Sequence, residues 1–156
     1  MKYVLLFLAH FYAVGNPTPA KLDPAQMFCV ATAVYHEARG EVQMGKVGVA
    51  WSVKNRVKSD GFPSTPCEAV YEAKQYTDIH KARPDYQSKA WKDSVEAAVY
   101  VFAGYVDDPT KGARFYYNPK KTEKPTWTKV NILATIGQHV FWDKGQWART
   151  DTRSEE

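Results

Sequence analysis

A glutamate in the stretch from Val34 to Glu41 could act as a catalytic acid. Glu37 follows a mostly apolar segment, and a carboxyl group at the end of such a helix would be desolvated and close to the negative helix pole. Both effects raise a carboxyl pKa. The protonated acid could then donate to the leaving oxygen of a glycosidic bond. The same position is also typical of a helix cap or of an ion pair with Arg39.

A metal site is a second interpretation of this stretch. His36-Glu37 is similar to the start of a zinc-peptidase helix, but Gly40 stands where the second histidine would be needed. The two cysteines lack metal-type spacing. The histidines also form no recognised ligand spacing: they are His10, His36, His80 and His139. We therefore expect no metal and no cofactor.

The segment before Glu37 is predicted to be a helix. Asp23-Pro24 reads as an N-cap followed by proline at the first helical position, and the apolar spacing continues it from Pro24 to His36. Gly40 offers a stop, which places Glu37 near the C-terminal end. Apolar faces and breakers predict further helical segments at Gln43–Lys58, Cys67–Glu72 and Gln87–Gly104.

After Pro109 the pattern changes to short strand-like pieces. They are Arg114–Asn118, Ile132–Ile136 and Gln138–Trp142. The predicted fold class is therefore α+β, mainly helical, with a small C-terminal β element. The 156 residues suit one domain, here 23–145, followed by a polar, frayed tail at 146–156.

The net charge of +4 favours anionic partners, such as peptidoglycan stem carboxylates, acidic polymers or nucleic acid. Six basic residues and one acid lie between Lys111 and Lys129, either as a solvated loop or as a contact surface for a polyanion. The chain has no recognisable nucleic-acid-binding motif, so we expect no nucleic-acid partner. The aromatic share of 14% suits either a sugar-binding groove or an ordinary core.

Residues 1–20 resemble an export signal, because Lys2 precedes an apolar run from Tyr3 to Val14. The run is shorter than the roughly 20 residues of a membrane span, so any membrane contact would be transient. The alternative is an N-terminal helix packed on the domain. In an oxidising compartment Cys29 and Cys67 could pair, whereas in the cytosol they would be separate buried thiols.

Several separated motifs, in one order and with matching spacing, resemble the SleB-type cell-wall hydrolases, the family of spore cortex-lytic enzymes. The resemblance covers nearly the whole chain after residue 20. Arg114 departs from it, because an apolar residue is expected there. The motifs that carry it are Ala33–Glu41, Gly45–Ala50, Lys54–Val57, Phe62-Pro63, Cys67, Gln75–Thr77, Ala113–Pro119, Trp127 and Ile136–Phe141.

The resemblance implies a lysozyme-like domain that acts on peptidoglycan between N-acetylmuramic acid and N-acetylglucosamine. It places the catalytic glutamate at Glu37 and supports a Cys29–Cys67 disulfide. His139 is interpreted as structural. For each aromatic ring near the expected cleft, core packing is as plausible as sugar contact. The expected substrate-binding residues are Glu41, Gln75, Tyr76, Tyr116, Tyr117, Asn118 and Trp127.

The number of carboxylates decides the expected reaction. A retaining or inverting hydrolase needs a second carboxylate roughly 5–10 Å from the acid, and the candidates are Glu41, Asp78 and Asp85. A lytic transglycosylase needs only one, and this is the favoured reaction. The alternatives are a muramidase, an amidase, and an inactive wall-binding or phage structural module. We expect an exported monomer in the periplasm or cell wall, with a phage-encoded enzyme acting on the host envelope also compatible.

Overall fold

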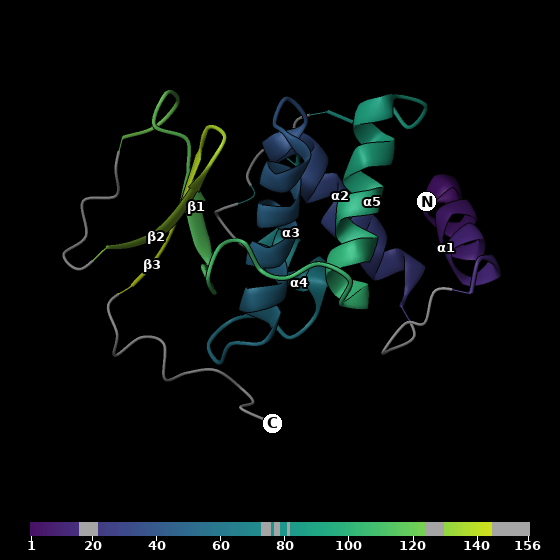
Figure 1. Ribbon diagram of the computed structural model, residues 1–156, viewed down its shortest axis with the longest axis horizontal. Helices are drawn as coiled ribbons and strands as arrows, with labels where there is room; N and C mark the ends of the chain where they lie inside the picture. The colour runs from purple at the N-terminus through teal and green to yellow at the C-terminus, as the bar shows by residue number, and fades with distance from the viewer. Residues whose placement is uncertain (16–21, 73–75, 77–78, 81, 124–129, 145–156) are drawn as a thin grey trace.

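The computed structural model describes residues 1–15, 22–72, 76, 79–80, 82–123 and 130–144. Within these residues a group of helices lies on one side and a small sheet on the other (Figure 1). The elements in chain order are α1 (Lys2–Ala13), α2 (Pro24–Ala38), α3 (Gln43–Val57), α4 (Pro66–Glu72), α5 (Lys89–Ala103), β1 (Phe115–Tyr117), β2 (Asn131–Ile136) and β3 (His139–Asp143).

The helix that carries Glu37 is α2, and it forms as its sequence predicts. The Asp23 side chain accepts a hydrogen bond from the Ala25 amide, and proline occupies the first turn. Val30, Ala31 and Val34 are completely buried against α3 and α5. The helix runs to Ala38, two residues beyond the predicted end, so Glu37 lies within its last turn.

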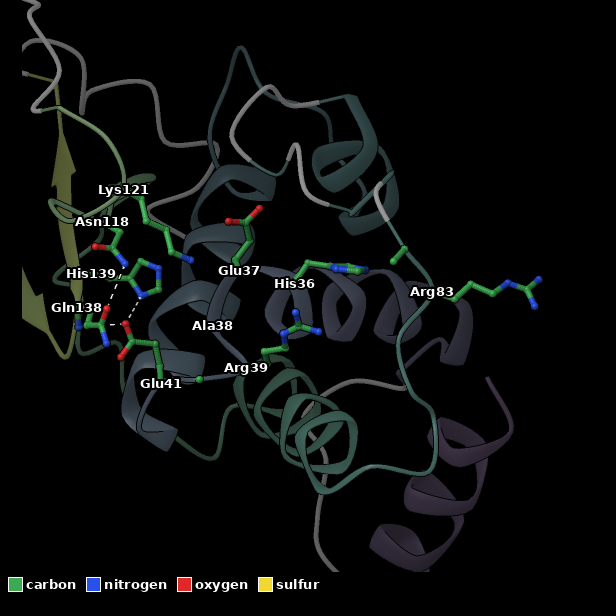
Figure 2. Close-up of a pocket in the computed structure, with 12 residues that line it drawn as sticks. His36, Glu37, Ala38, Arg39, Glu41, Arg83, Asn118, Lys121, Gln138 and His139 are labelled. Carbon is green, nitrogen blue, oxygen red and sulfur yellow. Dashed lines mark hydrogen bonds and ion pairs between the residues drawn. The ribbon is translucent and has the colours of Figure 1, made fainter.

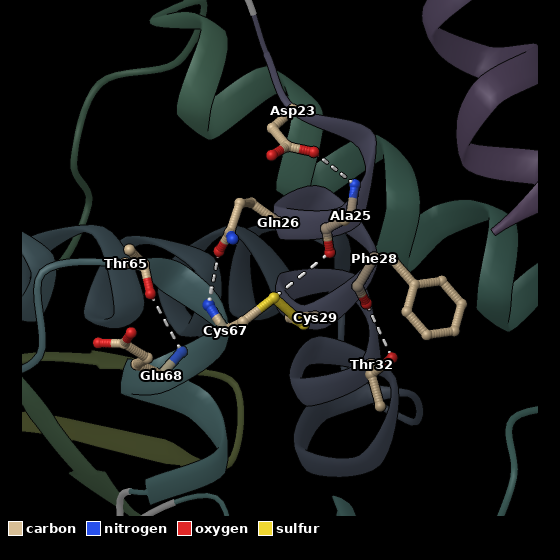
Figure 3. The surroundings of a disulfide bond; sticks show 9 residues. All are labelled: Asp23, Ala25, Gln26, Phe28, Cys29, Thr32, Thr65, Cys67 and Glu68. Atoms are coloured by element: carbon tan, nitrogen blue, oxygen red, sulfur yellow. Dashed lines mark hydrogen bonds between the residues drawn. A yellow bond between two sulfur atoms is a disulfide. The ribbon is translucent and has the colours of Figure 1, made fainter.

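The other predicted helices are confirmed. α5 is capped at its N-terminus by Ser88, whose hydroxyl accepts from the Trp91 amide, and at its C-terminus by Gly104 in the left-handed conformation with φ 83°. α4 is joined to α2 by the Cys29–Cys67 disulfide, with Cα atoms 5.1 Å apart (Figure 3). This disulfide confirms the predicted pairing.

The three predicted strands form one antiparallel sheet in the order β1-β3-β2. Tyr116 pairs with Phe141 across β1 and β3, and Ala134 pairs with Phe141 from the other side, next to a β-bulge. The central strand β3 is buried along its whole length. The α+β, mainly helical fold class is therefore confirmed.

The sheet packs on α3 where a glycine leaves room. A Cβ atom on Gly48 would lie 2.6 Å from the Phe141 ring, so glycine at this position lets β3 approach the helix closely. Arg114 forms a buried ion pair with Asp143, at 2.8 Å. The Arg114 carbonyl also accepts from the Arg56 side chain, at 2.6 Å. The charged residue at the expected apolar position is thus paired within the sheet.

Helix α1 lies on the domain in this structure. Val4, Leu8 and Phe11 are buried, and the Phe11 ring is 5.7 Å from that of Tyr100 on α5. This arrangement matches the alternative of a packed N-terminal helix, and removal of the segment during export stays a prediction. Among the described residues, no helix has the length and apolar character needed to cross a membrane.

Candidate active site

Glu37 lies on the wall of a cavity of about 450 Å³ between the end of α2 and the β2–β3 turn. Its side chain is partly exposed. Figure 2 shows the cavity residues: α2 and the following loop supply one side, and the sheet and its turn supply the other. The lining residues are His36, Glu37, Ala38, Arg39, Gly40, Glu41, Ala82, Arg83, Asn118, Lys121, Gln138 and His139.

Two buried tyrosines lie next to Glu37. Burial, together with the charge of the nearby Glu37, raises the pKa of Tyr116 well above its ordinary value. The Tyr116 phenol therefore stays protonated and can act as a donor next to the carboxyl group. Behind it, the Tyr76 hydroxyl is 2.8 Å from that of Ser52, and the two tyrosine rings are 6.1 Å apart.

Glu41 joins the helices to the β2–β3 turn. One of its carboxylate oxygens accepts a hydrogen bond from the backbone amide of Gln138 at 3.0 Å. The same oxygen lies 3.2 Å from Nδ1 of His139. Gly137 has φ 56°, and a Cβ atom there would overlap the Glu41 carboxylate. The turn is thus built so that its backbone can reach this glutamate.

His139 connects this contact to Glu37. Its ring is buried, packs edge-on against Tyr116 at 5.1 Å, and lies close to the backbone of Glu37. Carbonyl groups in the last turn of a helix have no partner within the helix, so a histidine at this place can donate to one of them. Burial is the main cause of a lowered His139 pKa, and the charge of Lys121 adds to it, whereas Glu41 opposes the shift. The structural role predicted for His139 agrees with these contacts.

The rim of the cavity carries positive charge. Arg39, Arg83 and Lys121 are exposed residues of its lining. In Figure 2, Lys121 reaches in from the sheet side, while Arg83 points away from Glu37. Arg39 donates to the Tyr35 hydroxyl at 3.3 Å. Such a rim favours a substrate that bears carboxylates.

The structure brings together only some of the predicted substrate-binding residues. Glu41 and Asn118 line the cavity with Glu37. Tyr76 and Tyr116 belong to the hydrophobic core, which was the alternative for each ring. Tyr117 is absent from the described lining, because neighbouring residues of a strand face opposite sides and Tyr116 points to the core. Gln75 and Trp127 lie outside the described residues.

The sequence prediction did not include several other residues that line this cavity. Gln138, Arg83 and Lys121 come from two loops and a turn, and their positions depend on how the sheet packs against α2 and α3. The only local signal is Gly137 between two strand-like pieces, which indicates a turn. It does not indicate which helix the turn faces.

Residues 40–142 match the family described as cell wall hydrolase. The chain belongs to this family. The matched range includes Glu41 and the β2–β3 turn, and it begins three residues after Glu37. The resemblance seen in the sequence is thereby confirmed.

The curated relatives of the family include spore cortex-lytic enzymes. That of Bacillus cereus is 36% identical over 132 residues, which cover 81% of this chain and 48% of the relative. That of Bacillus subtilis is 30% identical over 130 residues, covering 83% of this chain and 41% of the relative. The chain thus spans less than half the length of these two relatives.

Solved structures of relatives have the same fold. The catalytic domain of the germination-specific lytic transglycosylase SleB from Bacillus anthracis is 29% identical, with a TM-score of 0.64, covering 80% of this chain and 99% of that domain. The catalytic domain of Bacillus cereus SleB is 28% identical, with a TM-score of 0.62, covering 83% and 99%. The similarity therefore corresponds to a complete catalytic domain.

Proposed function

We propose that this protein cleaves the glycan strands of peptidoglycan between N-acetylmuramic acid and N-acetylglucosamine, as a lytic transglycosylase with Glu37 as the acid. The observation that carries the proposal is the place of Glu37. It lies in a cavity of about 450 Å³, on a fold shared with the catalytic domain of the lytic transglycosylase SleB from Bacillus anthracis. The positive rim suits the carboxylates of the stem peptides.

In the proposed reaction Glu37 works twice. It first gives its proton to the bridging oxygen, and the bond from that oxygen to C1 of the muramic acid breaks. The resulting carboxylate then takes the proton of the C6 hydroxyl of the same sugar, and O6 bonds to C1 to form a 1,6-anhydro ring. The glutamate ends protonated, as it began. A hydrogen bond donated by the neighbouring Tyr116 phenol would hold the carboxyl group in place through both steps.

The contacts of Glu41 support a reaction with one carboxylate. Glu41 lines the same cavity, but its carboxylate is held by the Gln138 amide and by His139, which suits positioning more than the activation of water. Asp85 is absent from the described cavity lining and accepts from the Gln87 amide. Asp78 lies outside the described residues. Hydrolysis with Glu41 as the base is the alternative that this arrangement disfavours.

Product analysis tests the reaction. Purified peptidoglycan is digested, and the soluble muropeptides are separated and weighed by mass spectrometry. We expect 1,6-anhydromuramic ends, and zymograms in which Glu37→Gln clears no zone. Ordinary reducing ends would show hydrolysis, and free stem peptides would show an amidase. Equal clearing by both forms would reject Glu37 as the acid, and no clearing by wild type would favour an inactive wall-binding module.

We further propose that the protein is exported and acts in the periplasm or cell wall, as a monomer. The Cys29–Cys67 disulfide supports this location, because disulfides persist in oxidising compartments. Intact-mass measurement of the protein recovered from its natural compartment, with and without thiol alkylation, checks the location, and size-exclusion chromatography checks the monomer. We expect two alkylatable thiols only after reduction. Two free thiols in the untreated protein would contradict export.

A further inference from the structure

A second cavity adjoins the Glu37 cavity. It measures about 350 Å³ and is lined by Phe28, Thr32, Tyr71, Ile79, His80, Ala82, Arg83, Pro84 and Tyr86. Ala82 and Arg83 line both cavities. The two cavities therefore meet at the loop that contains Ala82 and Arg83.

The course of α2 gives the joined cavities a direction. Phe28, Thr32 and His36 are spaced by four residues and so share one helix face, and Glu37 follows His36 directly. At about 1.5 Å per residue, Phe28 lies about 13 Å along the helix from Glu37. This length exceeds one disaccharide repeat of a glycan strand.

The side chains of the second cavity suit a sugar chain. Tyr71 and Tyr86 are 42% and 37% exposed, so part of each ring is accessible to a ligand. The Tyr86 ring is held by Phe28 at 5.9 Å and by Trp91 at 5.0 Å. Tyr71 contacts His80 at 5.8 Å. Firmly held aromatic rings offer flat apolar faces at little cost in conformational entropy.

The disulfide fixes the two sides of this cavity relative to each other. Cys29 follows Phe28 on α2. On α4, Cys67 precedes Tyr71 by four residues, so Cys67 and Tyr71 lie on the same face of that helix. Figure 3 shows Phe28 and Thr32 on α2 beside the Cys29–Cys67 bond. The cross-link therefore holds Tyr71 opposite Phe28 and Thr32.

We propose that this second cavity, lined by Tyr71, Tyr86 and Thr32, binds sugar rings of the same glycan strand that is cleaved at Glu37. The proposal rests on the proposed function and names how far along its substrate the protein reaches. The open aromatic faces favour the glycan over the stem peptide as occupant. The affinity then depends on strand length.

Binding of peptide-free glycan strands tests this proposal. Tetrasaccharides and octasaccharides prepared from peptidoglycan are titrated into the full chain by calorimetry, with Glu37→Gln to preserve the strands. We expect the octasaccharide to bind more tightly. Tyr71→Ala should weaken octasaccharide binding about tenfold, the loss of about one stacking contact. Tyr71→Phe should retain the affinity, because the ring remains.

The matched control is Tyr12→Ala, which removes a tyrosine of similar exposure, 43%, from α1. It should leave both affinities unchanged. If Tyr71→Ala keeps the full gain from strand length, the proposal is wrong. A gain seen only with peptide-bearing strands would also overturn it, in favour of a peptide site. Length-dependent binding without cleavage by wild type would reject the proposed function alone.

Discussion

The two sides of the Glu37 cavity are held in place by different forces. The helical wall, formed by the end of α2, rests on completely buried apolar residues such as Val30 and Val34. The sheet also packs through Phe141 on α3, but its β2–β3 turn, which forms the other wall, is held by polar contacts of Glu41, and the far end of β3 by the Arg114–Asp143 pair. Apolar packing is spread over many atoms, whereas the polar contacts depend on single groups. The sheet wall should therefore be the more sensitive to small substitutions.

Asp143→Ala should have the largest effect on stability. Removing the carboxylate leaves the Arg114 guanidinium, only 7% exposed, without its ion-pair partner. We expect a loss of about 3–5 kcal/mol in the free energy of unfolding, measured by urea titration. The double variant Arg114→Met/Asp143→Leu is the control and should recover most of the loss. A loss below about 1 kcal/mol in the single variant would show that the pair does not hold the sheet.

Breaking the disulfide tests the helical side. Cys29→Ser/Cys67→Ser opens a cross-link between residues 38 apart. The typical loss for such a change is about 2–4 kcal/mol, and urea titration measures it. Wild type in reducing agent should match the variant, while reducing agent should leave the variant unchanged. A variant as stable as the oxidised wild type would mean that packing alone positions α4.

Gly137→Ala tests the contact between the walls. The new Cβ atom meets the Glu41 carboxylate, and the left-handed backbone adds about 1–2 kcal/mol of its own. Gly61→Ala is matched, because Gly61 has φ 80° with no atom near its Cβ position. We expect both variants to lose stability, but only Gly137→Ala to lose peptidoglycan-cleaving activity as well. Equal activity in the two variants would show that the contact between Gly137 and Glu41 does not affect the active site.

The smallest expected effect is a pH dependence from His139. Its pKa is lowered in the folded state, so the unfolded chain binds the proton more readily. The contribution of His139 to stability is therefore complete above about pH 6.5 and is lost as the pH falls towards the folded-state pKa. Urea titrations between pH 7.5 and 5 should show a smaller decrease for His139→Gln than for wild type. Parallel decreases would assign the dependence to other groups.

The difference between local signals and contacts of distant segments also explains what the sequence could predict. The start of α2 follows from Asp23-Pro24 and the end of α5 from Gly104, because these residues act within their own segments, and the apolar spacing predicts the buried faces. The strands were predicted too, but not their order β1-β3-β2 or the approach of Phe141 to Gly48. Those features depend on contacts between distant segments.

The same limit applies to the site. Glu37 and Glu41 were found because they share one motif. The place of Glu37 at the end of an apolar helix suggested an acid, and the family resemblance supported that role and added Glu41. Gln138 was missed because the Glu41 bond to its amide spans 97 residues. The burial of Tyr76 and Tyr116 was not predicted, since an aromatic ring suits a core as well as a sugar-binding groove.

The most direct test of the account compares the two glutamates. Initial rates of muropeptide release from purified peptidoglycan are measured for wild type, Glu37→Gln and Glu41→Gln at one pH, with urea titrations to confirm folding. We predict that Glu37→Gln lowers the rate by about 10²–10⁴-fold without loss of stability. Glu41→Gln should lower it less and should destabilise the fold, because Glu41 holds the turn. A folded Glu37→Gln protein that retains its activity while Glu41→Gln is inactive would contradict the account.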